Sequence, residues 1–447
     1  MLSRLTDDAP LLFVHGYDLG SRIWARVRDG ARGAPMRLLG HRAVFVRGAE
    51  GVRLFYDETR IARHGAMPRF VQETLFGHGS VHSLDGDAHR HRKATFVDVA
   101  YEDAQVRRLL PELEREWQRA LHDWVAGVRR SAYDAAVGVF GRAGMTWAGL
   151  PGTTDARTRW AQRLAQIVDG FGRPLTPSFT LALFNRIWSD RQAARLIRAV
   201  RDGVLTAPEH TALHQWAWHR DHDGRLLADR LAGVELQNSI RPLIAVARFV
   251  AFAARRLHEH PQWRSRIHAE TAERGQLVGG PLATAFAQEI RRTAPFVPML
   301  PGRALTDLAF DGQHVPAGGR VVIDILGTDL DASSWDDPAR FRPERFLAQP
   351  DYEAIETFIP HGGAQVQSGH RCPGEKLAVV GLAAAIAALS DPRVQISGDG
   401  LSVDRRRLPT MPASGGCVHA AAARACTPTS SPQVPLANAG AETRSDS

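Results

Sequence analysis

Apolar positions recur at helical spacing through the middle of this chain. Between residues 101 and 222 they stand three or four apart, as at Leu109, Leu113, Trp117 and Leu121. This spacing places them on one face of a helix and predicts a series of amphipathic helices. No candidate site is assigned to this part of the sequence.

Residues 224–258 are predicted to form one longer helix, amphipathic at first and then apolar on all sides. Its middle holds Arg241, followed by Pro242. Pro242 has no N–H group and should bend the helix. Arg241 places a cation on an apolar helix, where an unpaired charge is costly. It therefore needs an anionic partner, either an acidic residue of the chain or a bound carboxylate held by two parallel hydrogen bonds.

Strand-like segments lie on both sides of the helical region. Residues 36–57 predict a hairpin, a turn at residues 47–51 and a short helix. Residues 304–325 predict hairpins with glycine turns, and residues 401–422 predict short strands. These patterns favour a fold that is mainly α with small β-sheets.

Composition narrows the class of protein. The chain is 44% hydrophobic and 23% charged, as expected for a globular protein. A net charge of +8 suggests a nucleic-acid partner, but the arginines are spread along the chain and none is expected. No segment approaches the roughly 20 apolar residues of a membrane span. Three cysteines cannot build a disulfide framework, which favours the reducing cytoplasm.

Residues 358–375, FIPHGGAQVQSGHRCPGE, place Cys372 in a glycine-rich loop directly before a helical run. The free N–H groups of a helix N-terminus stabilise a nearby thiolate. A lone thiolate with flanking glycines suits the axial ligand of a haem iron. Two alternatives remain open, a buried cysteine that only packs and a catalytic thiol paired with a distant histidine.

Two further segments carry charged residues at helical spacing. Asp87 is predicted to cap a helix on which His89 and Lys93, four residues apart, share a face. Glu289 and Arg292 are one helical turn apart. By themselves these patterns are typical of a solvated basic face and of a surface ion pair.

The order of these segments resembles the cytochrome P450 superfamily. Glu289-x-x-Arg292 is followed by Phe341-Arg342-Pro343-Glu344-Arg345-Phe346 and then by the Cys372 loop. The likeness extends from about residue 36 to about residue 422. It implies the cytochrome P450 fold in a single domain, residues 1–424, and haem b (heme b) held by the Cys372 thiolate. The polar tail, residues 425–447, is predicted to be disordered.

The chain departs from the common P450 pattern in ways that are similar to the bacterial fatty-acid peroxygenase and decarboxylase branch. The span from Phe358 to Cys372 is long, and His370 stands where an arginine normally contacts a haem propionate. Arg241-Pro242 replaces the usual acid–Thr pair of the distal helix.

This resemblance assigns a role to each candidate residue. Arg63, His89, Lys93 and His370 would contact the haem propionates. Glu289, Arg292 and Arg345 would form a buried structural triad behind the haem. Leu75, Phe76 and Phe296 would border the substrate pocket. His82 would lie above the haem, where alkene-forming members carry His and hydroxylases carry Gln, although a purely structural histidine is an equal alternative.

The resemblance implies that Arg241, Pro242 and His82 are catalytic. Hydrogen peroxide would drive hydroxylation of long-chain fatty acids at the α or β carbon, or their decarboxylation to terminal alkenes. The substrate carboxylate, held by Arg241, would replace the missing acid as a proton carrier, with His82 assisting decarboxylation. No redox partner would be required. The alternatives are a reductase-dependent monooxygenase that docks its partner through a basic surface, and a non-catalytic haem-binding or sensing protein.

Overall fold

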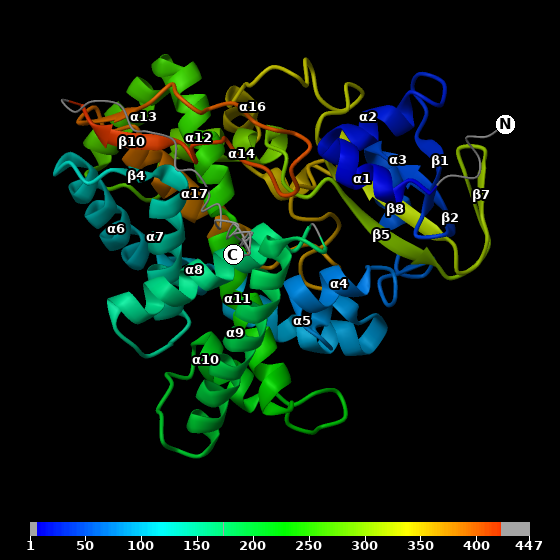
Figure 1. Ribbon diagram of the computed structural model, residues 1–447, viewed down its shortest axis with the longest axis horizontal. Helices are drawn as coiled ribbons and strands as arrows, with labels where there is room; N and C mark the ends of the chain where they lie inside the picture. Colours follow the sequence, from blue (N-terminus) through cyan, green and yellow to red (C-terminus); the bar gives the residue numbers. More distant parts are fainter. Residues whose placement is uncertain (1–6, 173, 422–447) are drawn as a thin grey trace, which may run out of the picture.

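Helices form most of the molecule, and a small sheet lies at one side, beside α1, α2 and α3 (Figure 1). The structure is a computed structural model that describes residues 7–172 and 174–421. The predicted fold class, mainly α with small β-sheets, is confirmed. Within the described part, no helix is both long enough and apolar enough to cross a membrane. The tail predicted to be disordered, residues 425–447, lies outside the described residues.

The longer helices build the core and the site. They are α5 (Gly86–Ala100), α6 (Asp103–Val125), α7 (Ala132–Trp147), α8 (Thr154–Gly170), α9 (Pro177–Arg201), α11 (Asp229–Ala245), α12 (Ala247–Glu259), α13 (Pro261–Arg274), α14 (Pro281–Thr293) and α17 (Glu375–Leu389). Shorter helices connect them. They are α1 (Ala9–His15), α2 (Leu19–Trp24), α3 (Gly48–Phe55), α4 (Arg69–Val71), α10 (Ala212–Trp218), α15 (Ile325–Asp329) and α16 (Glu344–Ala348).

Within residues 7–172 and 174–421 the strands form three sheets. The largest has the order β1 (Gly33–Leu38), β2 (His41–Val46), β8 (Arg320–Asp324), β5 (Met299–Ala304) and β3 (Ile61–Ala62). The second joins β4 (Arg130–Ser131), β10 (Cys417–Ala420) and β9 (Val394–Ile396), and the third joins β6 (Leu308–Phe310) and β7 (Gln313–Val315).

The predicted early hairpin exists, but its turn lies elsewhere. Strands β1 and β2 pair antiparallel around Leu39 and Gly40, whose φ angles are 51° and 80°. Two consecutive positive φ angles suit the twist of a two-residue hairpin turn. The predicted turn at residues 47–51 is wrong, because Gly48 already begins helix α3.

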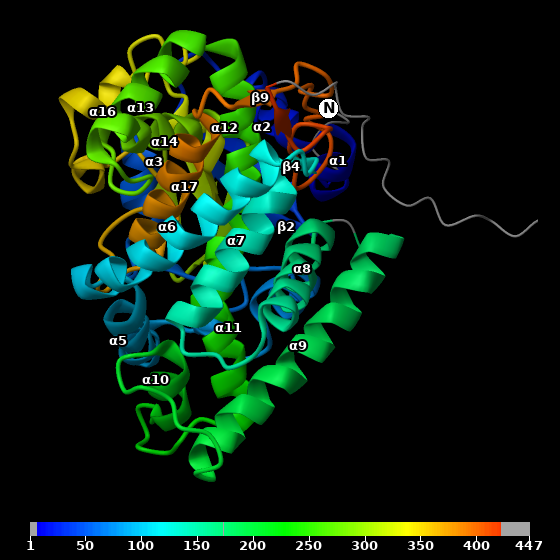
Figure 2. The same ribbon diagram turned by 90° about the vertical axis from the view of Figure 1, so that its left-hand side faces the viewer.

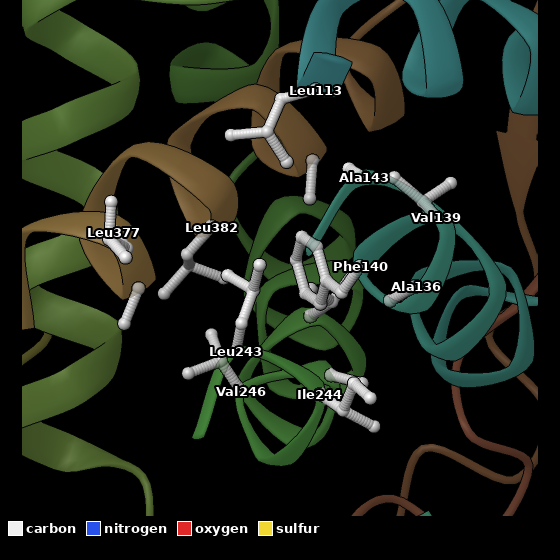
Figure 3. Close-up of a cluster of buried hydrophobic side chains, with 14 of the residues drawn as sticks. Leu113, Ala136, Val139, Phe140, Ala143, Leu243, Ile244, Val246, Leu377 and Leu382 are labelled. Atoms are coloured by element: carbon white, nitrogen blue, oxygen red, sulfur yellow. The ribbon is translucent and has the colours of Figure 1, made fainter. Parts of the chain in front are cut away.

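The core is formed where α7, α11 and α17 meet. Figure 3 shows Phe140 of α7 beside Leu243 and Ile244 of α11, with Leu382 of α17 close by. A Cβ atom on Gly381 would approach the Phe140 ring to 3.1 Å, so this glycine lets α17 pack closely against α7. Helices α8 and α9 lie side by side and pack on α11 (Figure 2). Helix α11 is therefore held on several sides.

The single helix predicted for residues 224–258 is two helices. Helix α11 begins only at Asp229 and ends at Ala245, and α12 follows after Val246. The interruption comes one turn after Pro242, where Phe249 N–H bonds to the Val246 carbonyl at 2.8 Å instead of continuing the α-helical pattern. The prediction failed because apolar residues continue across the break and hide it from a periodicity argument.

Candidate active site

A cavity of about 310 Å³ lies between α11, α5 and the loop that precedes α17. Most of the side chains around it are apolar. It gathers eleven predicted site residues from segments that are far apart in the sequence: Arg63, Leu75, Phe76, His82, His89, Lys93, Arg241, Pro242, Phe296, His370 and Cys372.

The glycine-rich loop presents Cys372 to this cavity. Cys372 N–H donates to the His361 carbonyl at 3.0 Å, which folds the loop back on itself. Gly362 has a φ of 93°, and a Cβ atom on Gly363 would lie 2.8 Å from the Tyr56 ring. Larger residues would be strained at both positions, so the loop keeps its shape through these glycines.

The charge state of Cys372 depends on its surroundings. Burial is the largest effect and raises the pKa of the thiol, whereas Lys93 and the Gly374 N–H lower it. The predicted help from backbone N–H groups is therefore present but smaller than the effect of burial. A thiolate here fits a site that also holds a cation, such as the iron of a haem.

Polar residues gather at one edge of the cavity. His89 and Lys93 are 2% and 4% exposed, so the alternative of a solvated basic face is wrong. His89 stacks on His370 with a ring separation of 4.0 Å, and its Nδ1 has no hydrogen-bond partner. Lys93 Nζ donates to the Arg371 carbonyl at 2.5 Å.

Arg63 is brought to the same edge by Asp85. The Asp85 carboxylate accepts the Arg63 and His64 N–H groups, each at 2.8 Å. Asp87, predicted as the helix cap, is instead inside the first turn of α5, because the helix already begins at Gly86. Arg63 Nη1 is buried without an acceptor. The unpaired Arg63 Nη1 donor and the unpaired His89 nitrogen at this edge could both meet the carboxylates of a haem, so the residues fit that cofactor.

Arg241 is 4% exposed and lines the cavity. Its Nη2 donates to Asn238 Oδ1 at 2.6 Å, and its Nη1 has no partner. Among the described residues no carboxylate forms an ion pair with it, and nearby Asp190 pairs with Arg186 at 2.8 Å. Burial, assisted by the charge of Arg186, lowers the pKa of Arg241 to about 9. The alternative of an acidic partner within the described chain is wrong.

His82 is in the 3₁₀ turn Val81–Ser83, opposite α11. Its ring stacks on Phe76 with a centroid distance of 4.2 Å. The His82 side chain is exposed, and it lines the cavity. Loss of solvation inside the cavity, with the nearby charge of Arg241, lowers the pKa of His82 to about 3. The imidazole is therefore neutral near pH 7, with one N–H donor and one nitrogen acceptor.

Glu289 and Arg292 of α14 come together with Arg345 of α16. Arg292 binds both Glu289 oxygens, at 2.7 and 2.8 Å, and the two side chains are fully buried. Arg345 Nε lies 3.6 Å from Glu289. The alternative of a surface ion pair is wrong.

The sequence reasoning missed Arg291, which is 1% exposed and pairs with Glu375, the first residue of α17. Glu375 also accepts from Arg371 Nε at 2.7 Å. A double arginine on a helix with an apolar face was the available signal. This pair ties α14 to the helix that follows Cys372.

Glu289→Ala should destabilise the protein by about 3–5 kcal/mol, because it leaves two arginines without their buried acid. Urea unfolding of the haem-loaded protein measures the change. Asp336→Ala is the control, since it removes an exposed partner of Arg342 and should unfold like the wild type. Equal midpoints for Glu289→Ala and the wild type would contradict the prediction.

Comparisons with known proteins agree with this geometry. The family described as Cytochrome P450 matches residues 255–389. The "Putative cytochrome P450 137" of Mycobacterium tuberculosis is 25% identical over 316 residues, which span 65% of this chain and 62% of that relative. The chain thus covers less than two thirds of this relative's length.

Solved structures match over nearly the whole chain. Cytochrome P450SP alpha in complex with (R)-ibuprophen is 35% identical, with a TM-score of 0.83 over 93% of this chain and 98% of that one. Ligand-free cytochrome P450 OleT is 29% identical, with a TM-score of 0.84 over 92% of this chain and 96% of that one. An OleT variant was also solved with arachidonic acid.

Proposed function

This chain belongs to the cytochrome P450 family, and we propose that it is a haem-thiolate peroxygenase of long-chain fatty acids. The observation that carries this proposal is the Arg241 guanidinium, which is buried in an apolar cavity with one nitrogen unpartnered. A carboxylic acid with a long apolar chain matches both features. Arachidonic acid, bound by a variant of a similar protein, has this chemistry.

Different residues would hold the iron and the carboxylates of the haem. Cys372 would supply a thiolate to the iron, and Arg63, His89, Lys93 and His370 would meet the two carboxylates. When bound, the haem supplies the oxidising chemistry, which a thiolate ligand favours by promoting O–O cleavage. The protein's own part is to orient the acid and to exclude water.

Arg241 fixes the head of the substrate. Its Nη1 donates to the bound carboxylate, while Asn238 holds Nη2 in place. The carbons next to the carboxylate then lie nearest to the reacting centre, which selects the α and β positions. A carboxylate oxygen held at Nη1 accepts a proton from the peroxide and returns it, so the substrate replaces the acid that α11 lacks at Arg241-Pro242.

Two reactions can be written in which hydrogen peroxide is the oxidant and all atoms balance. Hydroxylation converts the acid and peroxide into a hydroxy acid and water. Decarboxylation converts them into a terminal alkene, carbon dioxide and two molecules of water. Neither outcome needs an electron from a reductase.

A reductase-dependent monooxygenase is less well supported. A groove beside the Cys372 loop carries both signs of charge, with Asp57, Glu353 and Glu356 near Arg53. Arg53 itself pairs with Glu356 at 2.7 Å. This groove does not form the uniformly basic surface that an acidic partner would select.

The decisive experiment incubates the purified haem-loaded protein with a long-chain fatty acid and hydrogen peroxide. Mass spectrometry should detect hydroxy acids or terminal alkenes without a reductase. Products that form only with NAD(P)H and a reductase would favour the monooxygenase. Bound haem with no product under either condition would favour a sensing protein.

His82→Gln should lower the ratio of alkene to hydroxy acid. A glutamine amide keeps a donor and an acceptor in the cavity but loses the imidazole that would assist decarboxylation. Gas chromatography of the products measures the ratio. His78→Gln, an exposed histidine in the same loop, is the control and should leave the ratio unchanged. An unaltered ratio in His82→Gln would make His82 structural.

A further inference from the structure

Glu235 is a fully buried carboxylate on α11 that the proposed mechanism does not use. It lies one and two helical turns before Asn238 and Arg241. Its Oε1 accepts the Val81 N–H at 2.7 Å, and its Oε2 accepts Asn238 Nδ2 at 2.8 Å. These two bonds connect Glu235 to the turn that carries His82 and to the amide that binds Arg241.

The first connection fixes the Asn238 amide. Asn238 Nδ2 donates to Glu235 and also to the Phe76 carbonyl at 3.1 Å. Reversing the amide would place its oxygen against two acceptors, so only one orientation satisfies all three groups. In that orientation Oδ1 faces Arg241 Nη2 at 2.6 Å. Glu235 therefore decides which atom of Asn238 meets the guanidinium.

The second connection fixes the turn that carries His82. Val81, whose N–H binds Glu235, directly precedes His82 in this turn. Phe76, whose carbonyl binds Asn238, stacks on the His82 ring. The loop from residue 76 to residue 82 is thus attached to α11 at both ends. The separation between Arg241 and His82 follows from these attachments.

The charge of Glu235 is balanced on the side away from Arg241. Arg92 Nη1 lies 3.4 Å from Glu235 Oε1, and Arg92 also binds Asp221 at 2.5 Å and the Gly79 carbonyl at 2.8 Å. Glu235 makes no ion pair with Arg241. A neutral amide therefore separates the buried acid from the guanidinium, which leaves Arg241 Nη1 open.

We propose that Glu235 is a positioning residue that sets the preference for carboxylic acids and the ratio of alkene to hydroxy acid. It acts through Asn238 on Arg241 and through Val81 on His82. This inference rests on the proposed function of the cavity and adds a residue that does not itself line it.

Glu235→Gln tests the proposal with little change in volume. The glutamine oxygen still accepts from Val81, but its NH₂ group faces Asn238 Nδ2, donor against donor. Asn238 then turns its own NH₂ towards Arg241 or loses its bond to residue 235. Calorimetry should show at least about tenfold weaker binding of a long-chain acid, as expected when a charged group loses a buried hydrogen bond. Binding of the alcohol of the same chain length should change less than about twofold.

Two further variants complete the test. Glu116→Gln is the matched control, since Glu116 is 3% exposed and binds Arg142 at 2.6 Å outside the cavity lining. It should keep the wild-type preference for the acid. Asn238→Ala removes the connection itself and should reproduce the loss of preference, so it substitutes for Glu235→Gln if that variant folds poorly.

The outcomes separate this inference from the proposed function. An acid-over-alcohol preference and a product ratio that both stay at the wild-type value in Glu235→Gln would overturn the positioning role. The same loss of preference in Glu116→Gln would also overturn it, because the effect would then be general. If the wild type forms no product with acid and peroxide, the proposed function fails, and the binding measurement still decides the role of Glu235.

Discussion

Replacing Arg241 by alanine should abolish peroxide-driven turnover of long-chain fatty acids while haem remains bound. The substitution removes Arg241 Nη1, which is the buried nitrogen of this guanidinium that has no hydrogen-bond partner. A buried charge-assisted contact of this kind supports an expected loss of at least about 100-fold in kcat/KM. Product formation at several acid concentrations measures it, with haem content determined for each sample.

The same substitution should leave stability unchanged or raise it. Arg241 is a buried cation with no ion-pair partner among the described residues, so its removal relieves a desolvation penalty. Arg241→Lys is the matched variant, which keeps the charge and loses the planar fork, and it should retain part of the activity. Turnover by Arg241→Ala within threefold of the wild type would contradict the carboxylate role.

Replacing Cys372 by serine should remove the shifted Soret band of the ferrous–carbon monoxide complex and the peroxide-driven activity with it. A serine hydroxyl is not ionised near neutral pH and donates far less electron density than a thiolate. Absorption spectra of the reduced protein with carbon monoxide measure the change. Ser368→Ala, an exposed position of the same loop, should keep the wild-type spectrum. An unchanged band in Cys372→Ser would remove the ligand assignment.

Two buried arginines, Arg292 and Arg241, are expected to serve different purposes, the first for stability and the second for function. Arg292 has a full carboxylate partner in Glu289, so breaking that pair should destabilise the protein. Arg241 has only an amide, so its loss should affect substrate binding instead. A side chain that destabilises the fold at its position is typical of a functional site.

Much of the site could be predicted from residue type and order. Cys372 stands before a helix, and Arg241 interrupts an apolar helix, and both facts are local. Each states a chemical requirement, a cation for the thiolate and an anion for the guanidinium. The cavity contains both residues.

Other predictions failed where distant contacts decide. Asp85, not Asp87, precedes the first residue of α5, and its carboxylate holds the strand end at Arg63. Val246 interrupts the helix predicted across residues 224–258 although the apolar pattern continues. A local pattern cannot separate these alternatives, such as one helix or two, because they differ little in local preference. Tertiary packing selects one of them.

By itself the sequence determined the mixture of helices and small sheets, and it indicated the residues that we propose to hold a haem and an acid. The helices and sheets follow from periodicity, and Cys372 and Arg241 stand out by the chemistry of their side chains. The roles of the other candidate residues follow from the resemblance to the cytochrome P450 superfamily. Only the tertiary structure decided that Arg241 lacks an acidic partner in the described chain and that Glu235 binds Val81, 154 residues away. Burial and pairing are sums over neighbours from every part of the chain, so no local pattern contains them.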